Sequence, residues 1–224
     1  MNIVKLILSI IFWAFPWPIR RLFLNKAFGY KISSAANIGF SIILSNQLEM
    51  LEGARIGHLT MCKGLYMVRL GVSSKIGNLN WISGFPLKDK SFFSHRINRE
   101  PSLMIGDNSA ITHRHLIDCT DKITVGDFTT IAGNHSQFLT HSIDIMASKQ
   151  DCKPIQIGSY CLVGTACVFL PGSSLGDYCV LGANSLLNKS YVEQFRLYGG
   201  VPAVVVKELP KDAGYFTRKL GFIH

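Results

Sequence analysis

Aliphatic or aromatic side chains recur at every sixth residue between residues 157 and 187 of the chain. A helix repeats every 3.6 residues and a strand every two, so neither explains this period. A coil of short parallel strands does, because each strand contributes one buried residue before a tight corner. The pattern predicts a β-solenoid whose inward positions include Ile157, Val163, Phe169, Leu175, Leu181 and Leu187.

The same spacing extends upstream, with two interruptions at residues 84–104 and 138–156. Segments that leave a compact repeat are frequently functional. The first of them is basic and aromatic, and we expect it either to shape an acceptor site or to cover a subunit contact. Upstream inward positions are predicted at Ile38, Leu44, Met50, Ile56, Leu70, Ile76, Ile82, Ile105, Ile111, Ile117, Val125 and Ile131.

The period ends near Tyr191, and the remaining chain predicts a closing strand and a short basic helix. We therefore expect an apolar N-terminal segment at residues 1–30, a β-helix domain at residues 31–209 and a basic tail at residues 210–224. Nothing in the sequence indicates a second globular domain.

The first nineteen residues are almost wholly apolar, but the uninterrupted run is shorter than the roughly 20 residues that span a bilayer. Pro16 and Pro18 end or kink a helix there, and no small-residue cleavage site of a signal peptide is visible. Either residues 1–21 form an interfacial helix on the cytoplasmic face of the inner membrane, or the helix packs on the solenoid end or on a neighbouring subunit. Residues that suit the headgroup region are Trp13, Trp17, Arg20, Arg21 and Lys26.

Composition indicates the cellular compartment of the protein and argues against one class of partner. The chain has 224 residues, of which 48% are hydrophobic and 17% charged, and its formal net charge is +9. A basic surface suits nucleic acid, anionic lipid or a phosphate-bearing cofactor, but no recognition-helix, RNA-binding or zinc-finger pattern is present, so we expect no nucleic acid. The six cysteines show no paired spacing, and free buried thiols indicate a reducing, cytoplasmic compartment.

The repeat resembles the bacterial hexapeptide-repeat acyltransferases when it is taken together with LTHSID, VGTACVFLPGSSLGD, VLGANSLLNKS and YGGVPAVVVKEL. It is most similar to the colanic-acid, O-antigen and galactoside or maltose O-acetyltransferases. The resemblance implies an all-β fold, a left-handed parallel β-helix with a short helix at each end. It also implies a homotrimer that uses acetyl-CoA as donor and requires no metal.

His141 is the candidate catalytic residue, since it lies in the LTHSID segment where the period fails and matches the family's catalytic histidine. Transfer of acetyl to a hydroxyl needs a base, and the pKa of histidine lies near neutrality. We expect a backbone carbonyl or a carboxylate to hold the imidazole, and Asp144 is near in sequence without being assigned.

Three further residues are candidates for binding the acceptor. His115 occupies a slot that elsewhere holds a small residue, and rule-breaking residues concentrate at functional sites. Asp118 follows it in the segment ITHRHLIDC, at the place where galactoside-type enzymes contact their substrate, and His135 falls in a comparable slot if the register continues. For His115 and Asp118 a structural hydrogen-bonding role is the open alternative.

The resemblance implies that coenzyme A lies in an outer groove between neighbouring subunits. Backbone groups of the late turns then contact the pantetheine arm, and basic side chains meet the phosphates. This sequence has Asn184 where the family usually has glycine, which affects either the groove or only the turn. The matching positions are Gly164, Thr165, Gly182, Ala183, Lys189, Pro202, Ala203 and Lys207.

The sequence thus predicts an acetyl-CoA-dependent O-acetyltransferase that acts on a sugar or lipid-linked glycan during surface polysaccharide synthesis. Transfer is direct, through a ternary complex. Three alternatives stay open. They are a zinc enzyme of the gamma-type carbonic anhydrase kind, an N-acetyltransferase of an amino sugar or a serine acetyltransferase, and a non-catalytic scaffold.

Overall fold

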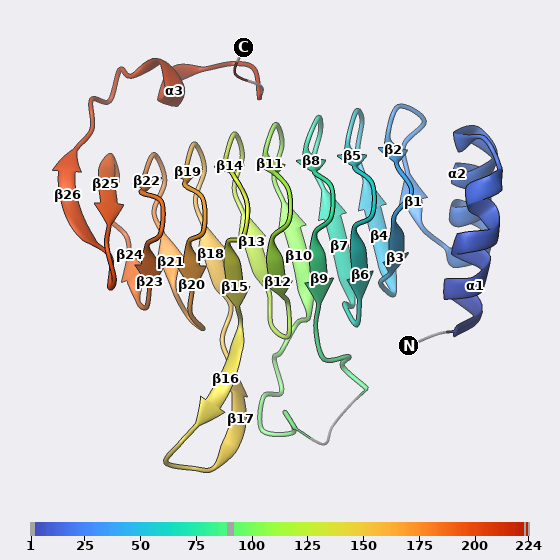
Figure 1. Cartoon of the computed structure of the whole chain (residues 1–224), viewed down its shortest axis with the longest axis horizontal. Coiled ribbons are helices and arrows are strands. Elements are labelled where there is room, and N and C mark those ends of the chain that lie inside the picture. The colour runs from blue at the N-terminus through green and yellow to red at the C-terminus, as the bar shows by residue number, and fades with distance from the viewer. Residues whose placement is uncertain (1–2, 89–91, 222, 224) are drawn as a thin grey trace.

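Three long sheets form the faces of a coil that runs from the N-terminal to the C-terminal end of the chain (Figure 1). The structure is a computed structural model and describes residues 3–88, 92–221 and 223. Sheet A contains β1 (Lys31–Ile32), β4 (Gln47–Met50), β7 (Met67–Leu70), β10 (Ser102–Ile105), β13 (Ile123–Val125), β18 (Ile155–Ile157), β21 (Ser174–Leu175) and β24 (Ser190–Tyr191). Sheet B contains β2 (Asn37–Ile38), β5 (Arg55–Ile56), β8 (Lys75–Ile76), β11 (Ala110–Ile111), β14 (Thr130–Ile131), β19 (Leu162–Val163), β22 (Val180–Leu181), β25 (Arg196–Gly199) and β26 (Val204–Glu208). Sheet C contains β3 (Ile42–Leu44), β6 (Met61–Lys63), β9 (Trp81–Ser83), β12 (Leu116–Asp118), β15 (Gln137–Leu139), β20 (Val168–Phe169) and β23 (Leu186–Leu187).

Apart from β26, which pairs antiparallel with β25, the strands of these sheets pair in parallel with the equivalent strand one coil later, so the inward side chains form continuous stacks. In sheet C, for example, Ile82 stacks on Ile117, Ile117 on Phe138, and Phe138 on Phe169. The stacked rings of Phe138 and Phe169 have centroids 4.6 Å apart, close to the strand spacing. The predicted all-β, left-handed parallel β-helix is confirmed.

The six-residue period is regular from sheet A to sheet B as far as Leu181, and it varies most from sheet C back to sheet A. Eight residues separate Cys62 from Leu70, and Ile117 from Val125, across that step. One predicted inward position is wrong: Ile43 is 5% exposed and points inward, whereas Leu44 is only partly buried. The first turn into sheet C is one residue shorter than the period, which moves the buried position by one.

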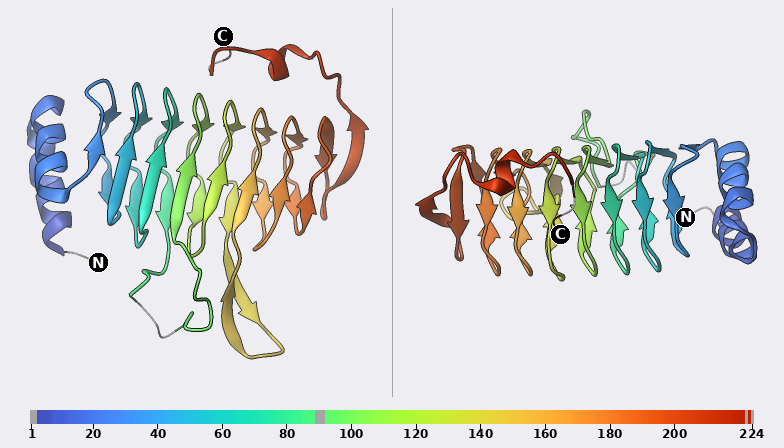
Figure 2. Two further views of the ribbon diagram at one scale, coloured as in Figure 1. Left: turned by 180° about the vertical axis from the view of Figure 1, so that it is seen from behind. Right: turned by 90° about the horizontal axis from the view of Figure 1, so that it is seen from above.

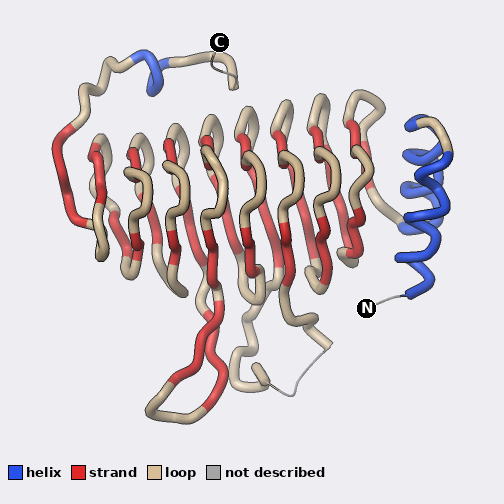
Figure 3. The backbone as a smooth tube through the Cα atoms, viewed as in Figure 1, coloured by secondary structure: helices blue, strands red, loops and turns tan. Residues whose placement is uncertain are grey.

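Both predicted interruptions leave the coil where sheet C meets sheet A, and we call this set of corners the C–A edge (Figures 1 and 3). The first excursion follows β9 and is shorter than predicted, because residues 102–105 already form β10. The second is an antiparallel hairpin of β16 (His141–Asp144) and β17 (Lys149–Cys152). The corners between sheet B and sheet C form the B–C edge, and no excursion of this size occurs there among the residues described.

The N-terminal segment forms two helices and a short turn that cover one end of the coil (Figure 2), where a single helix was predicted. These are α1 (Ile3–Ile11), the 3₁₀ turn η1 (Phe12–Ala14) and α2 (Trp17–Phe28), and residues 1 and 2 lie outside the described residues. The indole of Trp17 donates to the carbonyl of Ala36, and the buried guanidinium of Arg20 donates to the carbonyl of Gly39. These two residues face the coil, so their predicted place among lipid headgroups is wrong. Within the described part of the chain, no helix is both long enough and apolar enough to cross a bilayer.

Residues 209–221 return along the outside of the coil after β26 (Figure 2). Helix α3 (Gly214–Thr217) is short, as predicted, but it carries aromatic rather than basic residues. Its Phe216 packs edge-on against Tyr178 and Phe195, which belong to a stack of rings along the coil. This segment covers part of the outer surface of the C-terminal half of the coil.

Candidate active site

The C–A edge carries three successive features, one above the other. The first excursion, described at residues 84–88 and 92–101, follows β9. A tight corner at residues 119–122 follows β12, and the β16–β17 hairpin follows β15. Residues 89–91 of the predicted first interruption lie outside the described residues. The three strands are neighbours in sheet C. The corner after β12 therefore lies between the two excursions, and Asp118 is the last residue before it.

His141 begins β16 and is held by Asp118. Its Nδ1 lies 2.6 Å from Oδ2 of Asp118, and its backbone N–H donates to the same oxygen at 3.1 Å. The residues are 23 apart in sequence but adjacent in space, because Asp118 pairs with Leu139 on the neighbouring strand. Two contacts to one oxygen fix both the position and the tilt of the imidazole.

Asp118 is itself buried, with 8% of its surface exposed. Its Oδ1 accepts from the N–H and the hydroxyl of Thr120 at 3.1 and 2.6 Å, and its Oδ2 accepts from the N–H of Thr140 at 3.0 Å. Burial acts to raise the pKa of Asp118, but the hydrogen bonds from His141 and Thr120 outweigh it and lower the pKa below its ordinary value. Asp118 is therefore a carboxylate at neutral pH.

A carboxylate can only accept a hydrogen bond, so Nδ1 of His141 carries the proton and Nε2 offers a lone pair. The hydrogen bond to Asp118 raises the pKa of His141, although partial burial opposes this. No hydrogen bond to Nε2 is made by the described residues. A neutral imidazole held in this way can take a proton at Nε2. Asp144 is not the partner, since its carboxylate accepts from the N–H of Ala147 in the hairpin turn.

Two aromatic rings of residues 84–101 stand against the imidazole. The centroids of Phe85 and Phe93 lie 5.5 and 6.3 Å from that of His141, at interplanar angles of 84° and 86°. The sequence did not predict that these rings contact His141, or that Thr120 and Thr140 donate to its partner Asp118. The signal for Thr140 was its position directly before His141 in the LTHSID segment.

His115 lies inside the coil, away from His141. It is 1% exposed, in the inward slot that the repeat predicted, at the B–C edge. Its Nδ1 accepts from the N–H of Ser136, and its Nε2 lies 3.0 Å from the hydroxyl of Thr112. It is one step in a ladder in which each side chain accepts the N–H of its equivalent in the next coil. The ladder runs through Ser41, Thr60, Asn80, His115 and Ser136. The geometry supports the structural role for His115, not contact with an acceptor.

We expect His115 to weaken the fold at acidic pH. Burial lowers its pKa to about 4, with added repulsion from His113 and His135. Between pH 6.5 and 4 the unfolded chain binds a proton here that the folded chain does not, so stability falls as the pH falls, by about 3 kcal/mol in total. His115→Asn should remove this loss, since Asn80 already performs the same role one coil earlier. The free energy of unfolding, measured with denaturant from pH 4 to 7, should fall in the wild type relative to His115→Asn as the pH is lowered. A difference between the two proteins that does not change with pH would contradict the assignment.

His135 is exposed at a corner of the B–C edge, with φ +59°, and does not occupy an inward slot. Ser136 occupies that slot because the step from Ile131 to Phe138 is one residue longer than the period. The side chains of His135 and His141 therefore belong to different edges. The structure brings Asp118 to His141, but neither His115 nor His135.

Most of the predicted donor positions lie together on the B–C edge. Gly164 and Thr165 form the corner after β19, and Gly182 and Ala183 form the next one, after β22. These corners stack closely, since a Cβ on Gly164 would lie 2.6 Å from the nitrogen of Ala183. The Thr165 hydroxyl donates to the carbonyl of Asn134 in the preceding corner.

The other four donor candidates are divided between places. Ala203 donates its N–H to the carbonyl of Leu186 at the start of β23, so Pro202 and Ala203 lie near the same edge. Ala203 is buried, whereas Lys207 is exposed on β26. Lys189 is on the C–A edge, with its Nζ 5.6 Å from the ring centroid of Tyr191. Within one chain, sheet C separates the B–C corners from His141.

Solved structures provide neighbours for this chain, although no known family model matches it. A variant of AntD, an N-acyltransferase from Bacillus cereus in complex with dTDP and coenzyme A, is 14% identical. That match covers 86% of this chain and 90% of that one, with a TM-score of 0.51. A hexapeptide-repeat acetyltransferase from Vibrio cholerae is 32% identical over 48% of this chain and 63% of that chain, with a TM-score of 0.45. A structure from Vibrio cholerae O1 complexed with acetyl coenzyme A is 21% identical, over 92% and 85%, with a TM-score of 0.41.

The structural neighbours of the chain are thus hexapeptide-repeat acetyltransferases and an N-acyltransferase. The likeness to AntD confirms the fold that the sequence predicted. The 32% identical match spans less than two thirds of the Vibrio protein.

Proposed function

We propose that the protein transfers an acetyl group from acetyl-CoA to a hydroxyl group of a sugar, in the synthesis of a bacterial surface polysaccharide. The observation that carries the proposal is the pairing of His141 Nδ1 with the buried carboxylate of Asp118 at 2.6 Å, which leaves Nε2 available. A hydroxyl loses its proton only as its oxygen attacks, so it needs a base at that moment. The pair supplies that base.

In the proposed reaction Nε2 of His141 takes the hydroxyl proton while the oxygen attacks the carbonyl carbon of the thioester. Asp118 stabilises the imidazolium that forms, since its carboxylate already accepts from Nδ1. The tetrahedral intermediate then collapses, the carbon–sulfur bond breaks, and the proton on His141 passes to the leaving thiolate. The products are the acetyl ester and coenzyme A.

The cysteines support direct transfer rather than a covalent acyl-enzyme. All six are free and buried. Burial raises the pKa of Cys62 and of Cys161 to about 12, so neither is a thiolate at neutral pH. Cys152, on the strand beside His141, also has its pKa raised by burial to about 12.

The separation of the two edges supports a homotrimer. If acetyl-CoA binds at the B–C corners, as the resemblance implies, the donor corners of one subunit must meet His141 of its neighbour. Exposed apolar side chains on and beside sheet C are suited to such a contact, and they are Leu59, Leu79, Trp81 and Leu116. A monomer with full activity would contradict this assembly.

Incubation with labelled acetyl-CoA and a panel of soluble and lipid-linked glycans tests the function. Coenzyme A release can be followed with a thiol reagent, since buried cysteines give little background. Label in an alkali-labile ester of a sugar is the expected result. Label in an amide would instead favour an amino-sugar acceptor, and AntD, described as an N-acyltransferase, makes that the necessary comparison. Stoichiometric zinc without transfer would favour the carbonic anhydrase alternative.

We also propose that helices α1 and α2 rest on the cytoplasmic face of an anionic membrane. The outer face of α1 carries only aliphatic side chains, and α2 adds two more. The exposed residues are Ile3, Val4, Ile7, Ile10, Ile11, Ile19 and Leu22. No acidic residue precedes Glu49, whereas Arg21, Lys26 and Lys31 lie in this region. An apolar face beside cations suits an anionic bilayer better than it suits a second copy of the same positive surface.

Vesicle sedimentation tests the membrane proposal. Ile7→Asp with Ile11→Asp should weaken binding to vesicles containing phosphatidylglycerol at least tenfold, because aliphatic area is lost and negative charge is added. Val205→Asp with Val206→Asp, at similarly exposed positions on β26, is the matched control and should bind as wild type does. Equal sedimentation of all three proteins would contradict the proposal.

A further inference from the structure

We propose that the described residues of the first excursion, 84–88 and 92–101, form the acceptor-binding surface of the active site, in which Phe85 and Phe92 receive the apolar face of a sugar ring and two arginines hold them in position. This inference rests on the proposed function, because it names the surface that meets the acceptor. We call Phe85, Phe92 and Phe93 the aromatic platform.

The three rings form one cluster beside His141. Phe85 lies 5.3 Å from Phe93 and 5.5 Å from Phe92, measured between centroids. Phe93 is 4% exposed and forms the base of the cluster, Phe85 is partly exposed, and Phe92 is 47% exposed. Phe85 and Phe92 are therefore both accessible to solvent, and Phe85 is the one that stands next to the imidazole.

Arg99 attaches the platform to the coil. It is 7% exposed, and its guanidinium donates to the carbonyls of Phe85, Pro86 and Thr120 at 2.6, 3.0 and 2.9 Å. Its guanidinium carbon also lies 4.8 Å from the ring centroid of Phe93. Thr120 is the residue whose hydroxyl holds Asp118. Arg99 thus connects the aromatic platform to the corner whose Thr120 holds Asp118, the partner of His141.

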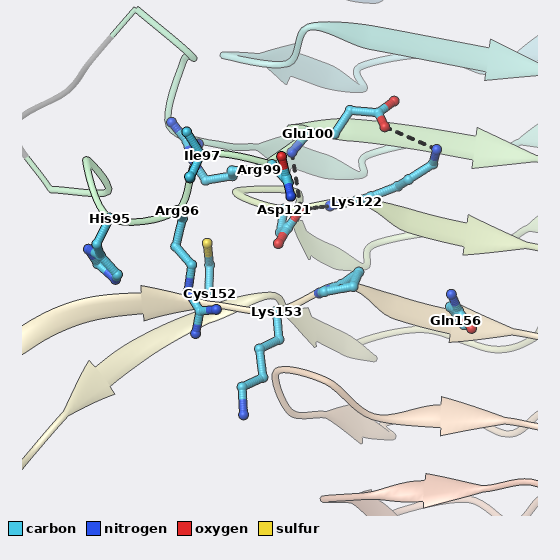
Figure 4. Close-up of a pocket in the computed structure, with 12 residues that line it drawn as sticks. His95, Arg96, Ile97, Arg99, Glu100, Asp121, Lys122, Cys152, Lys153 and Gln156 are labelled. Carbon is cyan, nitrogen blue, oxygen red and sulfur yellow. Dashed lines mark hydrogen bonds and ion pairs between the residues drawn. The ribbon is translucent and has the colours of Figure 1, made fainter.

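Arg96 attaches the same segment to the hairpin that carries His141. Its Nε and one terminal nitrogen donate to the two carboxylate oxygens of Asp151, each at 2.5 Å. Asp151 pairs with Ser142 in the hairpin, directly after His141. Figure 4 shows Arg96 extending toward Cys152 of β17, beside a cavity of about 440 Å³. This bidentate ion pair links the two excursions and limits their relative motion.

The position of His141 determines which part of the acceptor lies against the aromatic platform. An acceptor hydroxyl has to approach Nε2 of His141 to about 2.6–3.2 Å. The carbon skeleton attached to it then lies within a few ångströms, which is where Phe85 stands, 5.5 Å from the imidazole centroid. A pyranose has a face of C–H groups, and a flat aromatic surface is an apolar partner for such a face. The other possible occupant is a neighbouring subunit.

Steady-state kinetics of platform variants separates these occupants. Phe92→Ala and Phe85→Leu should each raise the KM for the acceptor about 3–10-fold, with the KM for acetyl-CoA unchanged. Phe85→Tyr, which keeps the ring, should raise this KM less than Phe85→Leu does. Arg99→Gln should raise the same KM through displacement of the platform. Phe40→Ala is the matched control, since Phe40 is 46% exposed but lies near the N-terminal helices, and it should behave as wild type.

An unchanged acceptor KM in both Phe92→Ala and Phe85→Leu would overturn the platform. So would a loss of trimer in sedimentation velocity without a change in KM, because the rings would then cover a subunit contact. Because Phe92 is exposed, its replacement tests the platform even if Arg99→Gln fails to fold. If wild-type protein acetylates no acceptor, the proposed function fails and the platform fails with it. If wild-type transfer is observed and the KM values do not change, only the platform is wrong.

Discussion

Replacing His141 with alanine should lower kcat for acetyl transfer by about 10²–10⁴-fold, because the hydroxyl then attacks without a base. The KM for acetyl-CoA should change little, since in the proposed reaction His141 acts on the acceptor hydroxyl, whereas the proposed donor corners bind the pantetheine arm. His141→Asn is the sharper variant. Its amide can still donate to Asp118, but it has no basic nitrogen where Nε2 stood. Both variants should therefore lose the same large factor.

The matched control for this experiment is His58→Asn. His58 is exposed at a B–C corner, where its Nδ1 accepts from the N–H of Phe40. Asn78, one coil later, accepts from the N–H of His58 in the same way, so asparagine fits the position. The control should keep wild-type kcat. Retention of wild-type turnover by His141→Asn would remove His141 from the role of base.

Sequence alone predicted the coil, and it proposed His141 as the base. The coil follows from the period, and the proposal for His141 follows from the failure of the period together with the resemblance of the LTHSID segment. Inward residues such as Ile157 and Phe169 predict the fold, because each coil buries a large apolar side chain at the same position of each strand. The prediction at Leu44 was wrong because a turn that is one residue shorter changes which of two neighbouring aliphatic residues is buried.

The partner of His141 was harder to predict, because it lies 23 residues away in the preceding coil. A signal for it was nevertheless present. If the strand that ends at Asp118 is placed over the strand that ends at Leu139, Asp118 comes within two residues of His141. The repeat placed His115 in an inward slot and left a structural role open. Only the stacked coils show that its ring continues a ladder of serine, threonine and asparagine side chains. The contacts of Arg99 depend on how an irregular segment folds, which periodicity does not describe.

Asp118→Asn should lower kcat by roughly 10²-fold or more and should move the acidic limb of the pH profile. Asparagine donates or accepts without charge, so it neither fixes the tautomer of His141 nor stabilises the imidazolium. The carboxylate raises the pKa of His141 above its ordinary value. A base must be unprotonated to act, so wild-type activity should fall as the pH drops through that raised pKa. In the variant the pKa of His141 is lower, and the fall should occur at a more acidic pH.

A smaller change at Thr120 separates positioning from charge. Thr120→Val removes the 2.6 Å hydrogen bond to Oδ1 of Asp118 but keeps the carboxylate. It should reduce kcat less than Asp118→Asn does, since Asp118 still accepts from Nδ1 of His141. Thermal unfolding shows whether each variant is folded before its kinetics are compared. If Asp118→Asn reduced kcat while the acidic limb stayed at the wild-type pH, the carboxylate would not be setting the pKa of the base. Asp118 would then act only by holding the Thr120 and Thr140 corners in place.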